Sequence, residues 1–285
     1  MSWALILHGG AKTIKHEDRA ANRAGCLEAL AAARAVLSAN GRAVDAVEAA
    51  VRQLEDDPTF NAGVGSQPNS EGDIEMCAAL MEGGDLNIGA VGAIRAVRHP
   101  ISVARLMLSE QPILMVADGA RTFASEHGAE LCELSDLKVN REPTEGRHDT
   151  VGCIALDNNG LFAVATSTGG LGGTPPGRVG DSPQPGCGFY ADNARGAVAF
   201  SGDGESIARL TLASRVMEAL ATRSPTDSIA GAIGSLVRIG GEAGGIALNR
   251  HGQIGWDHNS EHFAVAWMSG DDSKPQVRLS KVEGR

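Results

Sequence analysis

The feature that most constrains the fold is a pair of apolar, β-rich runs in the second half of the chain, at 150–156 and 161–166. They are joined by Asp157-Asn158-Asn159-Gly160, whose residue types tolerate the backbone angles of a tight turn. The two runs are therefore predicted to be adjacent antiparallel strands. A polar stretch at 128–149, without clear periodicity, precedes them and is predicted to be an exposed linker.

Segments with strand-like and helix-like patterns occur in both halves of the chain. Helices are expected at 17–39, 43–54, 101–108, 119–127, 205–220 and 225–239. Further strands are expected at 5–7, 88–97, 113–116 and 197–201, with 245–248 and 263–268 as a closing pair. Two apolar stripes are expected to face the core, one made of Leu27, Leu30, Ala31 and Leu37 and the other of Val44, Val47, Val51 and Leu54. This distribution predicts two sheets packed together beneath helical layers.

Composition excludes several classes of protein. The 285 residues suit one large domain or two small ones, and the net charge of −10 without a Lys/Arg cluster argues against nucleic acid or an anionic membrane as partners. No apolar run approaches the ~18–20 residues of a membrane span. The N-terminus shows no secretion signal, so a cytoplasmic location is expected. A disulfide framework or a zinc site is not expected from five cysteines without a CxxC pair: Cys26, Cys77, Cys132, Cys153 and Cys187.

Thr150 is the candidate nucleophile, and it directly follows His148-Asp149. A threonine hydroxyl needs a base within hydrogen-bond reach, and a chain cut just before the threonine supplies one, its own α-amino group. That group titrates near pH ~7.7–8, so an appreciable part of it is neutral at pH 7. The hypothesis is that the chain cleaves itself between Asp149 and Thr150. His148 is interpreted as a linker residue that helps local geometry during cleavage.

Seven short motifs occur in order along the chain, and together they closely resemble the plant-type L-asparaginase/isoaspartyl peptidase family of N-terminal nucleophile hydrolases. They are Leu7-His8-Gly9-Gly10-Ala11, Phe60-Asn61-Ala62-Gly63-Val64-Gly65, His99-Pro100-Ile101-Ser102, His148-Asp149-Thr150-Val151-Gly152, Thr166-Ser167-Thr168-Gly169-Gly170, Gly177-Arg178-Val179-Gly180-Asp181-Ser182-Pro183 and Ser201-Gly202-Asp203-Gly204-Glu205.

The resemblance implies a fold, a processing event and an assembly. The fold is the four-layer αββα sandwich of the N-terminal nucleophile hydrolases. One catalytic domain, residues 1–285, is cut into chains 1–149 and 150–285, and two such two-chain protomers form a homodimer.

The resemblance also implies roles for particular residues. Thr150 attacks the side-chain carbonyl of an asparagine or isoaspartyl group, and the hydroxyl of Thr168 tunes it. Arg178 grips the substrate α-carboxylate through a charge-assisted pair. Asp181 pairs with the substrate ammonium, and Gly204 belongs to the same substrate-binding group. The alternative for Arg178 and Asp181 is a salt bridge within their loop.

Three further residues and one ion are implied by the same resemblance. Gly202 and Ser201 donate to the oxyanion, Ser201 standing where the family usually has Thr. Asn61 supports the region around the nucleophile. No cofactor is needed for catalysis. A structural sodium ion is expected on the backbone carbonyls of Leu54, Glu55, Asp57, Phe60, Ala62 and Val64.

The implied activity is hydrolysis of the side-chain amide of L-asparagine or of the β-peptide bond of isoaspartyl dipeptides. Two departures from the family leave the substrate open. Asp149 stands where Gly is common, which is closer to glycosylasparaginases, and Cys77 replaces the usual Asp. A Taspase-like threonine protease and an unprocessed, non-enzymatic scaffold are two further possibilities. His8 is either a core histidine or a wall of the site.

Overall fold

The computed structural model describes residues 2–139 and 149–283. Twelve strands occur in these ranges, and they form two sheets. The first sheet has eight strands in the order β12-β11-β1-β5-β6-β2-β3-β4, namely Gln276–Arg278, His262–Ser269, Ala4–Lys12, Val151–Leu156, Phe162–Thr168, Met76–Glu82, Ile88–Ile94 and Leu114–Val116. The second has four in the order β10-β9-β8-β7, namely Ile254–His258, Ala243–Asn249, Gly196–Gly202 and Phe189–Asp192.

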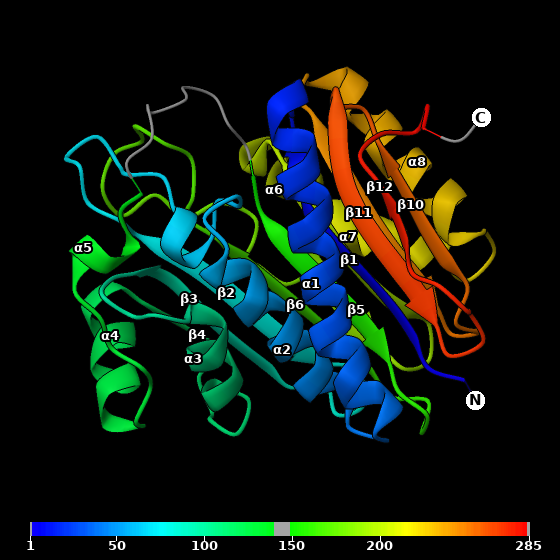
Figure 1. Cartoon of the computed structure of the whole chain (residues 1–285), viewed down its shortest axis with the longest axis horizontal. Coiled ribbons are helices and arrows are strands. Elements are labelled where there is room, and N and C mark those ends of the chain that lie inside the picture. The colour runs from blue at the N-terminus through cyan, green and yellow to red at the C-terminus, as the bar shows by residue number, and fades with distance from the viewer. Residues whose placement is uncertain (1, 140–148, 284–285) are drawn as a thin grey trace.

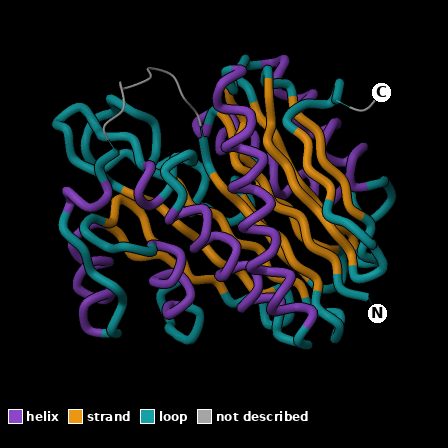
Figure 2. Tube along the Cα trace, in the orientation of Figure 1, coloured by secondary structure: helices purple, strands orange, loops and turns teal. Residues whose placement is uncertain are grey.

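Helices cover the outer face of each sheet (Figure 1). The eight-stranded sheet is covered by α1 (Arg19–Ser38), α2 (Ala43–Asp56) and α3 (Pro100–Met107), with α4 (Ala117–Glu126) and α5 (Leu134–Leu137) near its β4 edge. The four-stranded sheet is covered by α6 (Gly204–Leu210), α7 (Leu212–Ala219) and α8 (Pro225–Gly234). Short 3-10 turns lie at His16–Asp18, Gly63–Gly65 and Ser235–Arg238. The strands fill the middle of the molecule between these helices (Figure 2).

Three buried clusters define four layers, as predicted. In β5, Val151, Cys153 and Ala155 face the helices α1–α3, while Ile154 and Leu156 face the second sheet. A third cluster lies between the four-stranded sheet and α6–α8. Because successive side chains of a strand point to opposite faces, an inner strand buried on both faces must be apolar throughout. The αββα sandwich is therefore confirmed.

The predicted hairpin is confirmed in register, with Val151 opposite Ser167 and Leu156 opposite Phe162. Asp157 closes the turn: its side chain accepts from the backbone N–H groups of Asn159 (2.9 Å) and Leu161 (3.1 Å). Gly160 has φ +79°, which favours glycine. The hairpin matters because Thr150 directly precedes β5 and Thr168 ends β6, so both lie at its open end.

Several sequence-based expectations were wrong in detail. The segments 245–248 and 263–268 do not pair: β9 and β11 belong to different sheets. The helix expected over 205–220 is broken at Thr211, which adopts a left-handed conformation with φ +48°. The linker contains α5, held by a capping box between Glu133 and Asp136, while its residues 140–148 lie outside the described ranges. Strands β2, β7, β10 and β12 were missed.

The stripe expected on α2 is buried as predicted, but the stripe expected on α1 is only partly so. Leu30 and Leu37 are buried, Leu27 is intermediate and Ala31 is exposed. Within residues 2–139 and 149–283, no helix is long and apolar enough to cross a membrane.

Candidate active site

The predicted site residues converge at one end of the two sheets. Thr150 precedes β5, Thr168 ends β6, and Ser201 and Gly202 end β8. Because β1 runs antiparallel to β5, with His8 opposite Gly152, the far end of β1 arrives at the same place. The ends of four strands thus meet around a single peptide bond.

That bond joins Asp149 to Thr150, and both of its sides are held. The hydroxyl of Thr168 donates to the Asp149 carbonyl oxygen over 3.1 Å. The Thr150 N–H donates to Ser201 Oγ over 3.1 Å. The Thr150 hydroxyl lies 3.1 Å from the hydroxyl of Ser182, a motif residue for which the sequence suggested no role. The bond at which cleavage is predicted is therefore held on both sides, and both of its residues are buried; the preceding residue, His148, lies outside the described residues.

Ser201 is fixed by its surroundings. Its Oγ accepts from the N–H of Ala11 (3.0 Å) as well as from Thr150, and the side chain is fully buried. Two backbone donors therefore orient the hydroxyl without the methyl group that a threonine would supply. Gly202 has φ +144°, and a Cβ there would overlap the carbonyl oxygen of Glu242. Only glycine suits that position.

Arg178 and Asp181 are the charged residues of the site, and Gly204 lies beside both of them. A Cβ at Gly204 would lie 2.8 Å from Asp181 Oδ1 and 3.1 Å from Arg178 Nη2, so the glycine makes room for both charges. Arg178 pairs with Glu205 through Nε (2.9 Å) and Nη2 (2.7 Å), and not with Asp181. The alternative of an Arg178–Asp181 salt bridge is therefore wrong. The Nη1 side of the guanidinium is not used by Glu205, and a second carboxylate can bind there.

Asp181 is in an unusual state for a carboxylate. It is almost fully buried, and its Oδ2 has no hydrogen-bond partner among the residues that the structure describes. Burial raises its pKa to about 7, although a backbone hydrogen bond and the Arg178 guanidinium oppose the rise. Such a group gains most from an incoming cation, which would supply the missing partner.

Thr150, Thr168, Arg178 and Asp181 line one small cavity. Its wall is made of Asp149, Thr150, Thr168, Gly170, Leu171, Arg178, Asp181, Ser182, Gly202 and Gly204. The cavity holds about 10 Å³, which is room for about one water molecule.

Asn61 contacts the segment after Thr168 rather than the nucleophile. Its Nδ2 donates to the Gly170 carbonyl (2.7 Å), its Oδ1 accepts from the Gln67 N–H (2.9 Å), and its carbonyl accepts from the Gly169 N–H (2.8 Å). It holds the turn that follows Thr168, which agrees with the supporting role expected for it.

Sequence reasoning missed a buried ion pair beside the nucleophile. Lys12, the last residue of β1, pairs through Nζ with Asp149 Oδ2, and the two side chains are 5% and 3% exposed. The Nζ also lies 5.4 Å from the centre of the Phe60 ring. A single lysine separated from its partner by most of the N-terminal half gives no signal in the sequence.

The side chain of Glu55 was also missed, since only its carbonyl was expected to matter. It is fully buried and accepts from Ser167 Oγ (2.7 Å) and from the Ile101 N–H (3.0 Å), with His99 Nδ1 at 3.3 Å. Burial raises its pKa, and the contact with His99 opposes the rise. This network ties α2 and the start of α3 to the residue just before Thr168.

His8 is a core histidine that also lies against the nucleophile strand. Its ring is fully buried, packs 5.3 Å from the Phe263 ring and occupies the space that a side chain at Gly152 would need. Burial lowers its pKa to about 3, so the ring is neutral at pH 7. The interpretation as a core histidine is therefore supported, although neither ring nitrogen has a hydrogen-bond partner among the described residues, and His8 is not among the residues that line the cavity.

The segment expected to bind sodium folds back on itself. A Cβ at Gly63 would overlap the carbonyl oxygen of Glu55, and one at Gly65 would overlap that of Phe60. The carbonyl oxygens of Glu55 and Phe60 thus lie directly against these two glycines. Oxygen atoms are the ligands that hard cations prefer, and the sodium ion stays a prediction.

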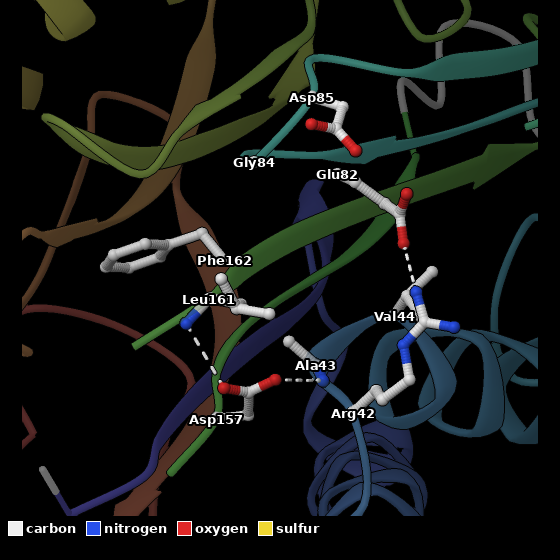
Figure 3. Close-up of a pocket in the computed structure, with 9 residues that line it drawn as sticks. All are labelled: Arg42, Ala43, Val44, Glu82, Gly84, Asp85, Asp157, Leu161 and Phe162. Atoms are coloured by element: carbon white, nitrogen blue, oxygen red, sulfur yellow. Dashed lines mark hydrogen bonds and ion pairs between the residues drawn. The ribbon is translucent and has the colours of Figure 1, made fainter. Parts of the chain in front are cut away.

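A larger pocket, of about 230 Å³, lies at the other end of the hairpin and contains none of the predicted site residues (Figure 3). Three of its four charged residues are engaged with the protein itself: Asp157 Oδ2 accepts from the Ala43 N–H (3.1 Å) at the start of α2, and Arg42 pairs with Glu82 (2.5 Å). The first contact fastens α2 to the hairpin, and the second joins the residue before α2 to β2.

Comparison with known proteins agrees with this geometry. The asparaginase family model matches residues 1–142 and 133–277. The chain is 37% identical to the isoaspartyl peptidase/L-asparaginase of Bos taurus over 96% of this chain and 95% of that protein. It is 37% identical to a probable isoaspartyl peptidase/L-asparaginase of Drosophila pseudoobscura pseudoobscura over 94% of this chain and 93% of that protein. The chain belongs to the asparaginase family.

The two residues noted in the sequence as departures from the family pattern, Asp149 and Cys77, both lie at the site. The Asp149 carboxylate occupies a niche against Gly10 and Lys12. Cys77 lies opposite Thr168 in the sheet. Burial raises the pKa of Cys77 to about 11, so the thiol is neutral and brings no charge to the site.

Proposed function

We propose that the chain cleaves itself between Asp149 and Thr150 and then hydrolyses the side-chain amide of L-asparagine or the β-peptide bond of isoaspartyl dipeptides, releasing aspartate. One observation carries this proposal: a buried peptide bond before a threonine, held on both sides, borders the cavity that contains Arg178 and Asp181. The names of the relatives support the substrate class.

Self-cleavage is an acyl shift followed by hydrolysis. The Thr150 oxygen adds to the Asp149 carbonyl carbon, the carbon–nitrogen bond breaks, and the nitrogen takes up the hydroxyl proton. Water then hydrolyses the resulting ester to an Asp149 carboxyl group and a free Thr150. The hydroxyl of Thr168 stabilises the oxyanion, since it already donates to the oxygen that becomes charged.

Turnover repeats this chemistry on a substrate. The new α-amino group of Thr150 accepts the hydroxyl proton as the oxygen attacks the β-carbonyl, and returns a proton to the departing ammonia or amino acid. Ser201 and Gly202 donate to the oxyanion, while Arg178 and Asp181 hold the substrate carboxylate and ammonium. Water then releases aspartate from the β-aspartyl ester.

Further properties belong to the proposal. On the strength of the family resemblance the working unit is a homodimer of two-chain protomers. On the strength of the sequence composition and N-terminus it works in the cytoplasm and binds neither nucleic acid nor membranes. The carbonyls of the segment 54–64 hold a structural sodium ion. Light scattering of the processed protein tests the dimer. Melting curves in sodium and in choline chloride test the ion.

Intact mass of freshly purified protein is the decisive experiment, with Thr150→Ala alongside. Masses of chains 1–149 and 150–285, absent in the variant, are expected. A single full-length mass in both samples after long incubation would contradict the proposal and favour the non-enzymatic scaffold.

Substrate choice follows from parallel assays of the processed protein. Asparagine and β-Asp-Leu are expected to be hydrolysed. Turnover of glycoasparagine alone would indicate a glycosylasparaginase, the alternative that Asp149 favours. Cleavage of a folded protein substrate without turnover of dipeptides would indicate a Taspase-like protease.

A further inference from the structure

We propose that Lys12 is a positioning residue for self-cleavage, and that its ammonium anchors and neutralises the side chain of the residue whose carbonyl is attacked. This inference rests on the proposed self-cleavage at Asp149–Thr150. It assigns to that step a residue outside the motifs that the resemblance rests on.

The niche for the Asp149 carboxylate is built into the fold. Lys12 follows an irregularity in the pairing of β1 with β11, between His8 and Ala11, which redirects the end of the strand. Gly10, within the irregularity, has φ +106°, and a Cβ there would overlap Asp149 Oδ1. The backbone of β1 is therefore shaped around this carboxylate, and the ammonium of Lys12 closes the niche.

Burial makes this pair an unusual choice for stability alone. Both side chains are almost fully removed from solvent. Replacing such a pair by well-packed neutral groups is often neutral or stabilising, because two charges must lose their hydration. A buried ion pair beside the bond to be cleaved is better explained by an effect on the cleavage of that bond.

The pair adds a third point of attachment. Thr168 holds the Asp149 carbonyl oxygen, and Ser201 holds the Thr150 nitrogen. With the Asp149 side chain held as well, rotation about the bonds on either side of the carbonyl carbon is restricted. The face of the carbonyl presented to the Thr150 hydroxyl is thereby fixed.

The charge of Lys12 also matters during the reaction. Attack by Thr150 places negative charge on the Asp149 carbonyl oxygen, a few bonds from that residue's own carboxylate. Two like charges so close in a buried site repel each other strongly. The Lys12 ammonium offsets the carboxylate, so the oxyanion forms beside a neutral pair rather than beside an anion.

A pulse of protein synthesis, stopped with an antibiotic and followed by intact mass over time, measures the rate of self-cleavage. Lys12→Met is expected to slow the appearance of chains 1–149 and 150–285 by ~10²-fold, because it loosens the peptide and leaves an anion beside the oxyanion. Lys12→Arg, which keeps the charge, is expected to stay within ~10-fold of the wild type.

The double variant Lys12→Met/Asp149→Asn separates the charge of Lys12 from its anchoring contact. It removes both charges and is expected to cleave ~10-fold or more faster than Lys12→Met alone. Melting temperatures of the same changes in a Thr150→Ala background, which cannot be cut, report the effect on the fold. If Lys12→Met does not fold, Lys12→Arg and the double variant still decide the question.

Cleavage of Lys12→Met at the wild-type rate would overturn the inference, and a double variant as slow as Lys12→Met would overturn the neutralising role of the ammonium. Either leaves the proposed function standing, provided that the wild type is processed. A wild type that is never cut would instead remove the proposed function itself.

Discussion

A buried aspartate lies at each end of the β5–β6 hairpin, and the two carboxylates differ in their hydrogen-bond partners. At the turn, Asp157 accepts hydrogen bonds from the N–H groups of Asn159, Leu161 and Ala43. At the open end, Asp181 is as deeply buried, and its Oδ2 has no partner among the described residues. The first carboxylate stabilises the fold. The second is left needing a cation, which indicates a binding site.

This contrast predicts that replacing aspartate by asparagine lowers the activity at one end of the hairpin and leaves it unchanged at the other. Asp181→Asn is expected to lower kcat/KM for asparagine by ~10²–10³-fold, because the substrate ammonium loses its buried counter-charge. Its melting temperature at pH 8 should not fall, since the change removes a buried charge. Steady-state kinetics and thermal melting of the processed protein check both. Asp157→Asn is the matched control and should keep full activity.

Truncation at the turn is the next largest effect expected. Asp157→Ala leaves the N–H groups of Ala43 and Leu161 without their acceptor, which should lower the free energy of unfolding by about 1–3 kcal/mol. Urea unfolding of the Thr150→Ala precursor measures this without interference from processing. Unchanged stability would show that the two aspartates do not differ as described.

The pH dependence sharpens the contrast further. The raised pKa of Asp181, about 7, means that the free enzyme binds the substrate ammonium well only above that pH. The Thr150 amine must also be neutral, and its pKa is ~7.7–8. Well below pH 7, kcat/KM should therefore fall by about 100-fold per pH unit, while kcat falls by about 10-fold, because bound substrate keeps Asp181 ionised. Equal slopes would contradict a role for Asp181 in binding.

The smallest effect on kcat is expected from Ser201→Thr. The Ala11 N–H already holds the Ser201 hydroxyl, so the added methyl group should change kcat by less than ~3-fold. The position is fully buried, and the extra methyl group should lower stability by about 1–3 kcal/mol. Ser201→Ala, which removes the donor, should instead lower kcat by ~10²-fold. Steady-state kinetics of both variants separate the effect of the added methyl group from the effect of losing the hydroxyl donor.

Local patterns in the sequence were enough to predict the hairpin, α2 and the layers. The turn at 157–160 and the apolar stripe of α2 are short-range features, and each acts within a few residues. The candidate site was predicted through motifs, and the structure brings Thr150, Thr168, Arg178 and Asp181 to one cavity as expected.

Features that depend on distant partners were not predictable. Both β9 and β11 are apolar on both faces, so alternation could not indicate which sheet each joins. Thr211 breaks a helix without glycine or proline to mark the break. Lys12 and Glu55 acquire their roles only from residues that folding brings to them.

The position of Asp149 in the cavity wall has a kinetic consequence. In the uncut chain Asp149 lines a space of about 10 Å³. If the chain cleaves itself as proposed, the uncut molecule is a zymogen that carries its own activator, and no second protein is needed to switch it on. Each molecule is then expected to mature by a first-order process, with a half-life that is the same in dilute and in concentrated solution.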